Sequence, residues 1–214
     1  MLQIEKFEFN PFQENTYILY DETDECIIID PGCADKSEEN AMVEFIQNKH
    51  LVVKQLINTH CHIDHVLGNA FVSSKWQLDL EMHKEDLSIL LSVANYAHLY
   101  GLESYEISPE PKTFLDEGDQ ILFGNSKLDI LFVPGHAPGH LAFVSHKEKF
   151  VIGGDVLFNG SIGRTDLPGG SFEILEKSIK EKMYKLDDEF TVYCGHGPET
   201  TIGQEKRSNP FVKM

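Results

Sequence analysis

The 214-residue sequence predicts an α/β fold in which two β-sheets pack face to face and helices cover both outer sides. Three observations support this fold class. Runs of alternating or continuous apolar residues, typical of strands, cluster in each half of the chain, and segments with apolar residues at helical spacing accompany them. Several strand-like runs end in histidine or aspartate, at the place where α/β sheets bind ligands. No linker or low-complexity tract interrupts the pattern, so we expect one domain over residues 1–214.

Each half of the chain contains strands followed by helices. In the first half the predicted strands are residues 2–9, 14–20, 25–30, 52–58 and 78–82, and the predicted helices are 36–49, 67–77 and 84–100. In the second half the predicted strands are 119–123, 127–133, 141–145, 149–154 and 190–194, with a helix at 171–185. Residues 101–112 contain two prolines and no clear period, which predicts a surface loop of the kind that often forms a substrate lid.

The net charge of −17, from 18 Lys+Arg against 35 Asp+Glu, limits the classes of partner. Such a surface repels nucleic acid and anionic membranes, so neither is an expected partner. The N-terminus lacks the basic start and apolar run of a signal peptide, and no apolar run approaches the length of a membrane span, so we expect a cytoplasmic protein. The four cysteines show no paired spacing, which favours free thiols.

The most informative stretch is residues 59–65, in which four of the seven residues are good ligands for a divalent metal. Residues two apart in a helix point about 200° apart, so His60 and His62 could not grip one ion there. In an extended segment the side-chain period is two, and both imidazoles project to the same side. Asp64 keeps this parity and His65 breaks it. The pattern therefore predicts the end of a strand that turns into a loop around metal.

Further candidate ligands stand where other predicted strands end. His136 follows Val133-Pro-Gly, Asp155 follows an apolar run that ends in Gly-Gly, and His196 follows Gly195. Each motif alone is weak, because a Gly-His at a strand end is more often part of a turn than a ligand. Together they are strong, because open sheets bind ligands outside the carboxyl ends of their strands. The seven candidate metal ligands are His60, His62, Asp64, His65, His136, Asp155 and His196.

Seven ligands suit two ions. With Asp155 bridging, one ion has three histidines plus the bridge or a water, and the other has Asp64, one or two histidines and the same bridge. An open position remains, which is typical of a catalytic rather than a structural site. Asp30 closes an apolar strand before Pro31-Gly32, and we expect its carboxylate to point into the site. The alternative is an aspartate that only forms the turn.

The order of these motifs resembles the metallo-β-lactamase superfamily. The resemblance implies a four-layer αββα sandwich, with two mixed β-sheets, helices on both outer faces and a dinuclear metal site at one edge of the sheets. Other motifs are similar to glyoxalase II, the hydroxyacylglutathione hydrolases, and to the short bacterial branch of that group. They lie at residues 68–69, 135–140, 154–158, 163–170 and 195–211.

The resemblance also implies a role for each ligand and two divalent ions, with zinc expected before iron or manganese. Asp64 and Asp155 are expected to act in catalysis as well as in binding, and His140 matches a family position that does not bind metal. The implied assignments are His60, His62 and His136 for the first metal, Asp64, His65 and His196 for the second, Asp155 as the bridge, and Asp30 as an acid that orients the metal loop.

The expected reaction is hydrolysis of a small-molecule thioester, S-lactoylglutathione or a related hydroxyacyl thioester, by a metal-bridging hydroxide. Bound metal lowers the pKa of water from 15.7 towards about 7, and a thiol with a pKa of about 8.5 leaves as thiolate without a strong acid. Long glyoxalase II chains append a helical domain that holds glutathione, and the stretch after His196 is too short for one. We expect Arg164 to hold the substrate carboxylate; the alternative is a structural ion pair with Asp166.

The main alternative is a mononuclear iron persulfide dioxygenase of the same superfamily, in which His60, His136 and Asp155 would form the facial triad. The complete set of second-metal ligands favours the hydrolase. The acidic surface argues against a nuclease, a β-lactamase would be expected to carry a secretion signal, and an open seven-ligand site argues against a binding module. The oligomeric state is left open by the sequence.

Overall fold

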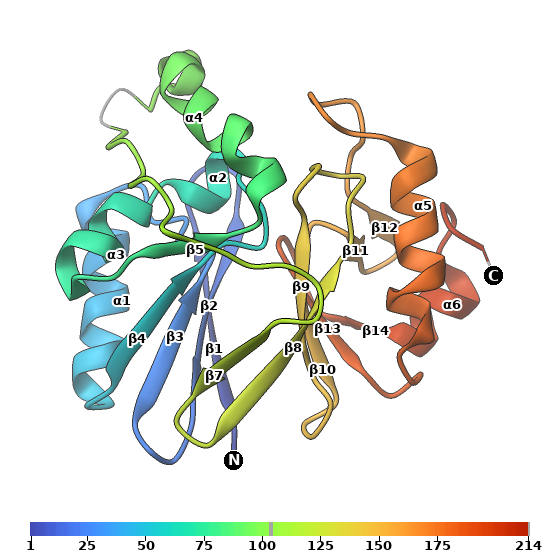
Figure 1. The fold of residues 1–214 in the computed structure, drawn as a ribbon, viewed down its shortest axis with the longest axis horizontal. Coiled ribbons are helices and arrows are strands. Elements are labelled where there is room, and N and C mark those ends of the chain that lie inside the picture. The colour runs from blue at the N-terminus through green and yellow to red at the C-terminus, as the bar shows by residue number, and fades with distance from the viewer. Residues whose placement is uncertain (103–104, 214) are drawn as a thin grey trace. The chain divides into compact units, whose positions relative to one another are not determined.

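The computed structural model describes residues 1–102 and 105–213. It contains two six-stranded mixed sheets, a two-stranded ribbon and helices (Figure 1), so the predicted α/β class with two mixed sheets is confirmed. The chain divides into two compact units, Met1–Leu115 with Leu122–Lys127, and Asp116–Ile121 with Leu128–Met214. The single domain stays a prediction. Residues 103–104 of the predicted loop at 101–112 lie outside the described part.

The first sheet has the strand order β1-β2-β3-β4-β5-β6. Neighbours are antiparallel from β1 to β3 and parallel from β3 to β6. Because β3 and β4 are parallel neighbours, the residues that follow them meet at the same edge of the sheet. This brings Asp30 next to the start of residues 59–65, the predicted metal loop. The strands are β1 (Gln3–Phe9), β2 (Glu14–Tyr20), β3 (Glu25–Ile29), β4 (Val52–Ile57), β5 (Leu80–Met82) and β6 (Thr113–Phe114).

Helices of the first unit bury their apolar side chains against this sheet. Met42, Val72 and Leu90 belong to one buried cluster with Ile28 and Leu56 of the central strands. The predicted helix at 84–100 is divided into two 3₁₀ turns and one α-helix, and a four-residue helix within the metal loop was not predicted. The helices are α1 (Lys36–Asn48), α2 (Ile63–Val66), α3 (Asn69–Trp76) and α4 (Leu87–Tyr96), with 3₁₀ turns η1 (Lys84–Asp86) and η2 (Ala97–Tyr100).

The second sheet has the order β14-β13-β10-β9-β8-β7. Its central pair, β10 and β13, is parallel, so Asp155 and His196 follow adjacent strands at the same edge. Leu175 and Ile179 of α5 pack in one cluster with Val151. The elements are β7 (Gln120–Phe123), β8 (Ser126–Phe132), β9 (Leu141–Ser145), β10 (Phe150–Gly154), β11 (Leu157–Phe158), β12 (Ser161–Ile162), α5 (Phe172–Glu181), η3 (Met183–Lys185), β13 (Thr191–Cys194), β14 (Thr200–Thr201) and α6 (Ile202–Ser208).

The cysteines are buried free thiols, as the sequence predicts. Burial raises the pKa of Cys26 to about 12. Burial, with Asp86 and Asp30 nearby, also raises the pKa of Cys61 well above its usual value. A thiol that stays protonated is a poor metal ligand, so the Cys61 position within the metal loop suits packing. Among the helices that the structure describes, none is long and apolar enough to cross a membrane.

Candidate metal centre

Asp30 is a buried acceptor at the end of β3. Its Oδ1 accepts the backbone N–H of Thr59 at 2.6 Å, and its Oδ2 accepts the Thr59 hydroxyl at 2.5 Å. The same Oδ2 lies 3.2 Å from Nδ1 of His65. Asp30 has a left-handed backbone, with a φ of 51°, which turns the chain sharply at this point. The carboxylate therefore fixes Thr59 and His65 by hydrogen bonds, and its expected role as the acid that orients metal ligands stays a prediction.

His60 is held in one tautomer by this network. The Thr59 hydroxyl has a single proton, which it donates to Asp30, and it lies 3.1 Å from Nδ1 of His60. Nδ1 of His60 is therefore the donor of that contact, and the lone pair of its Nε2 is available to a metal. The same argument applies to His65, because Asp30 accepts from its Nδ1 and leaves Nε2 as the ligand atom.

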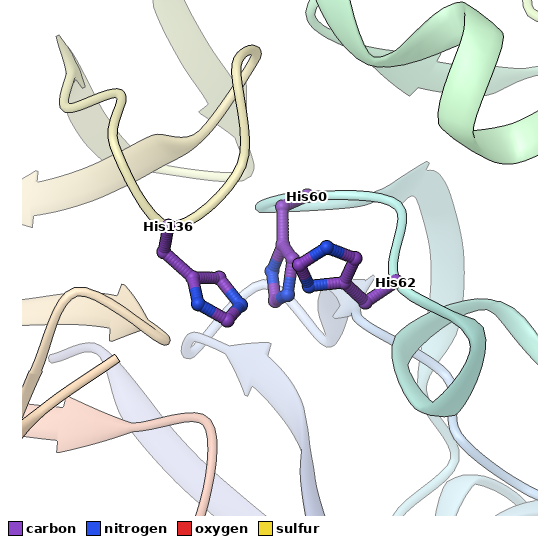
Figure 2. A group of neighbouring side chains, drawn as sticks. All are labelled: His60, His62 and His136. Atoms are coloured by element: carbon purple, nitrogen blue, oxygen red, sulfur yellow. The ribbon is translucent and has the colours of Figure 1, made fainter. Parts of the chain in front are cut away.

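The metal loop changes from extended to helical backbone at Ile63, as the broken parity of His65 predicts. His62, with φ −66° and ψ 154°, is the last extended residue, and α2 begins directly after it. The rings of His60 and His62 lie 4.9 Å apart at an interplanar angle of 90°. Figure 2 shows both rings on the loop that follows β4. In α2, Nε2 of His65 lies 3.7 Å from Oδ2 of Asp64.

The backbone of the loop is also fixed from outside. Asn58 donates its side-chain amide to the carbonyl of His65 at 3.0 Å, and the N–H of Cys61 donates to Oδ2 of Asp86 at 2.8 Å. Asp86 is fully buried at the end of η1. Neither Thr59 nor Asp86 was predicted from the sequence. A sequence signal existed only for Thr59, which directly precedes the first ligand.

In the second unit, Asp155 lies between two histidines. Its Oδ2 is 3.4 Å from Nε2 of His136 and 3.5 Å from Nε2 of His196. His136, which Figure 2 shows on the loop after β8, donates from Nδ1 to the carbonyl of Arg164 at 2.8 Å, so its Nε2 carries the lone pair that can act as a metal ligand. Gly163 permits this approach, because a Cβ there would lie 1.9 Å from the Asp155 carbonyl and 2.9 Å from Nδ1 of His136.

Two other residues of the second unit have defined contacts. Nε2 of His140 accepts the backbone N–H of Asp155 at 3.0 Å, and the expectation that His140 does not bind metal stays a prediction. The Arg164 guanidinium donates two hydrogen bonds to Asp166, at 2.8 and 2.7 Å, and both side chains are largely exposed. These bonds, together with the charge of Arg164, lower the pKa of Asp166 to about 2. The substrate-binding role of Arg164 stays a prediction.

The donor sets of both units fit a divalent metal. Two ligand atoms that bind one tetrahedral ion at about 2.1 Å lie about 3.4 Å apart. The distances from Asp155 to His136 and His196 match this separation, and the distance from Asp64 to His65 is close to it. Among the candidate ligands, the rings of His60, His65 and His136 have described Nδ1 contacts, and all three leave Nε2 as an acceptor.

Histidine nitrogens and carboxylate oxygens at these separations are the donor set of a candidate site for a divalent metal. The chain matches the family described as the Metallo-beta-lactamase superfamily over residues 9–196. It therefore belongs to the metallo-β-lactamase superfamily, and its fold is that of this family.

Among its relatives, hydroxyacylglutathione hydrolase GloC of Haemophilus influenzae is 37% identical, over 99% of this chain and 98% of the relative. The crystal structure of BLEG-1 B3 metallo-beta-lactamase is similar with a TM-score of 0.88 and 30% identity, covering 99% of this chain and 100% of that one. The crystal structure of TTHA1623 in a di-iron-bound form has a TM-score of 0.86 and 36% identity, and the match covers 97% of this chain and 100% of that one. The similarities support a metal-dependent hydrolase.

Proposed function

We propose that the chain is a dinuclear metal-dependent hydrolase of thioesters, with S-lactoylglutathione or a related hydroxyacyl thioester as its substrate. The observation that carries the dinuclear part is the position of Asp155, whose Oδ2 is nearly equidistant from Nε2 of His136 and of His196. The resemblance assigns these two histidines to different ions. One oxygen beside both is the arrangement that a bridging carboxylate needs.

The proposed ligands are the seven that the sequence predicts. By the resemblance, His60, His62 and His136 would hold the first ion, Asp64, His65 and His196 would hold the second, and Asp155 would be the ligand shared by both. Zinc is the expected metal, and the di-iron form of TTHA1623 makes iron the first alternative. The proposal of a thioester rests on the 37% identity to a hydroxyacylglutathione hydrolase over nearly the whole of both chains.

The residues of the chain prepare this chemistry by orientation. When bound, the ions supply a hydroxide at neutral pH and polarise the substrate carbonyl. Asp30 and Thr59 fix the tautomers of His65 and His60, and the Arg164 carbonyl fixes that of His136, so these three rings present Nε2 without reorganisation. The proposed leaving thiolate needs no general acid.

A comparison of three reactions tests the proposal. Metal-loaded protein is assayed for hydrolysis of S-lactoylglutathione, for oxygen uptake with glutathione persulfide, and for hydrolysis of a β-lactam. We expect thioester hydrolysis that is abolished by a chelator, with the other two rates at background. Oxygen uptake without thioester hydrolysis would replace the proposal by the iron dioxygenase, and β-lactam turnover as the fastest reaction would replace the substrate class.

A further inference from the structure

Glu14 is a fully buried acid at the start of β2. Its Oε1 lies 3.7 Å from Nδ1 of His65, beside the contact that His65 makes with Asp30. Within the described part of the chain, no hydrogen-bond donor reaches this Oε1. A buried polar atom that gives up its hydrogen bond costs free energy, so its place in the fold requires a reason. The reason that the geometry offers is its contact with the ring of His65.

The other oxygen of Glu14 joins a network at the turn after β3. Oε2 lies 2.9 Å from the hydroxyl of Thr16, and that hydroxyl accepts the N–H of Gly32 at 2.9 Å and contacts the carbonyl of Asp30 at 2.9 Å. The Thr16 hydroxyl therefore contacts both Asp30 and Gly32 of the turn, and Glu14 is linked to the turn through that hydroxyl. Asp30 is also the residue that orients His65.

A second residue of the same hairpin holds the backbone of a predicted ligand. The Asn10 amide donates to the carbonyl of Gly32 at 2.9 Å and to the carbonyl of Asp64 at 3.0 Å. A Cβ at Gly32 would lie 2.0 Å from Oε2 of Glu14 and 2.7 Å from both the Asn10 amide and the Asp64 carbonyl. Space, rather than backbone conformation, therefore requires glycine at this position, where the hairpin meets the metal loop.

We propose that Glu14 is a positioning residue for the second metal: it holds the His65 ring and the Asp30 turn in place from the β1–β2 hairpin, with Asn10 holding the Asp64 backbone beside it. The inference rests on the proposed function in that Asp64 and His65 are taken as ligands of the second ion. It does not depend on which substrate the enzyme hydrolyses.

Chelator competition tests the proposal on the metal-loaded, full-length protein. Zinc retained per chain is measured against rising chelator concentration for wild type, Glu14→Ala and Glu14→Gln. We expect Glu14→Ala to weaken binding of one of the two ions 10- to 100-fold, as loss of an outer partner of a metal ligand does, and to leave binding of the other within about threefold. Glu14→Gln keeps the bulk and a hydrogen bond to Thr16, so it is expected to restore wild-type retention.

The matched control is Glu81→Ala. Glu81 is a partly buried acid on β5 of the same sheet, but its side chain bonds to Gln55 rather than to the metal loop. Should Glu14→Ala fail to fold, Thr16→Val removes the same network with almost no change in shape and is expected to weaken binding of the same ion. Wild-type retention in Glu14→Ala or Thr16→Val, or equal weakening of both ions in either variant, would overturn the proposal.

A spectroscopic readout separates this inference from the proposed function. In side-chain ¹⁵N spectra of the loaded protein, the ring nitrogens of His65 should shift in Glu14→Ala, and those of His136 should not. An unshifted His65 signal overturns the positioning role. A wild type that shows the expected retention and shifts but does not hydrolyse any thioester would reject the proposed function and leave the role of Glu14 standing.

Discussion

Replacing Asp30 by alanine tests how the metal loop is held. The substitution removes the acceptor of three donors, the N–H and hydroxyl of Thr59 at 2.6 and 2.5 Å and Nδ1 of His65 at 3.2 Å. Each hydrogen bond to a charged acceptor contributes about 1.5–3 kcal/mol, and the three share one carboxylate, so we take about 4 kcal/mol for the set. Alanine at the left-handed φ of 51° adds about 1 kcal/mol.

The free energy of unfolding of Asp30→Ala should therefore fall by about 4–5 kcal/mol, measured by urea unfolding in chelator so that metal affinity does not contribute. Asp30→Asn keeps one accepting oxygen and tolerates the left-handed backbone, so its free energy of unfolding should fall by about 2 kcal/mol only. A loss below about 1 kcal/mol for Asp30→Ala, or a larger loss for Asp30→Asn than for Asp30→Ala, would refute the network described for this residue.

Three further predictions concern metal, substrate and pH. Asp155→Ala should lower the retention of both ions and His196→Ala mainly that of one, by elemental analysis; small, equal losses in both variants would reject the bridge. Arg164→Ala should raise KM about tenfold for a charged thioester and less for a neutral one, with metal content intact. An equal rise in KM for both substrates would mean that Arg164 only forms its structural ion pair with Asp166. Burial of Asp21 would raise its pKa, but hydrogen bonds from Thr23, Ser126 and the Asn125 backbone outweigh this and lower the pKa to about 2. The folded-state pKa lies below the unfolded one, so this stabilisation, at most about 2 kcal/mol, is complete above pH 4 and is lost between about pH 4 and 2. In urea unfolding, the free energy of unfolding should fall less between pH 5 and pH 2.5 for Asp21→Asn than for wild type. Equal falls in the two proteins would contradict the prediction.

The predicted strands and longer helices lie within a few residues of the observed ones because their signals are local. The run Cys26–Ile29 is continuously apolar and is buried on both faces of the sheet. The helix α6 was missed because it has only seven residues, too few for a helical period, and it begins at the Thr201 cap. The predicted helix at 84–100 is interrupted where Asp86 faces the N–H of Cys61, a tertiary contact that no local pattern indicates.

The candidate ligands were found because metal chemistry restricts the side chains that can take part, and parallel strands carry those side chains to one edge. The support around them was less visible. Asp30 stood out because it ends an apolar strand before Pro31-Gly32. Glu14 did not, because it reads as the first, polar residue of a strand, and its contacts with Thr16 and His65 appear only when the chain is folded.

Stepwise metal loading tests the central claim most directly. Metal-free protein is given zinc in increments from zero to three equivalents per chain, and the rate of S-lactoylglutathione hydrolysis is measured at each step together with the bound zinc. A dinuclear hydrolase predicts that the rate rises until about two ions are bound per chain and then stays constant. A rate that is maximal with one bound ion, or no hydrolysis with two ions bound, would contradict the account.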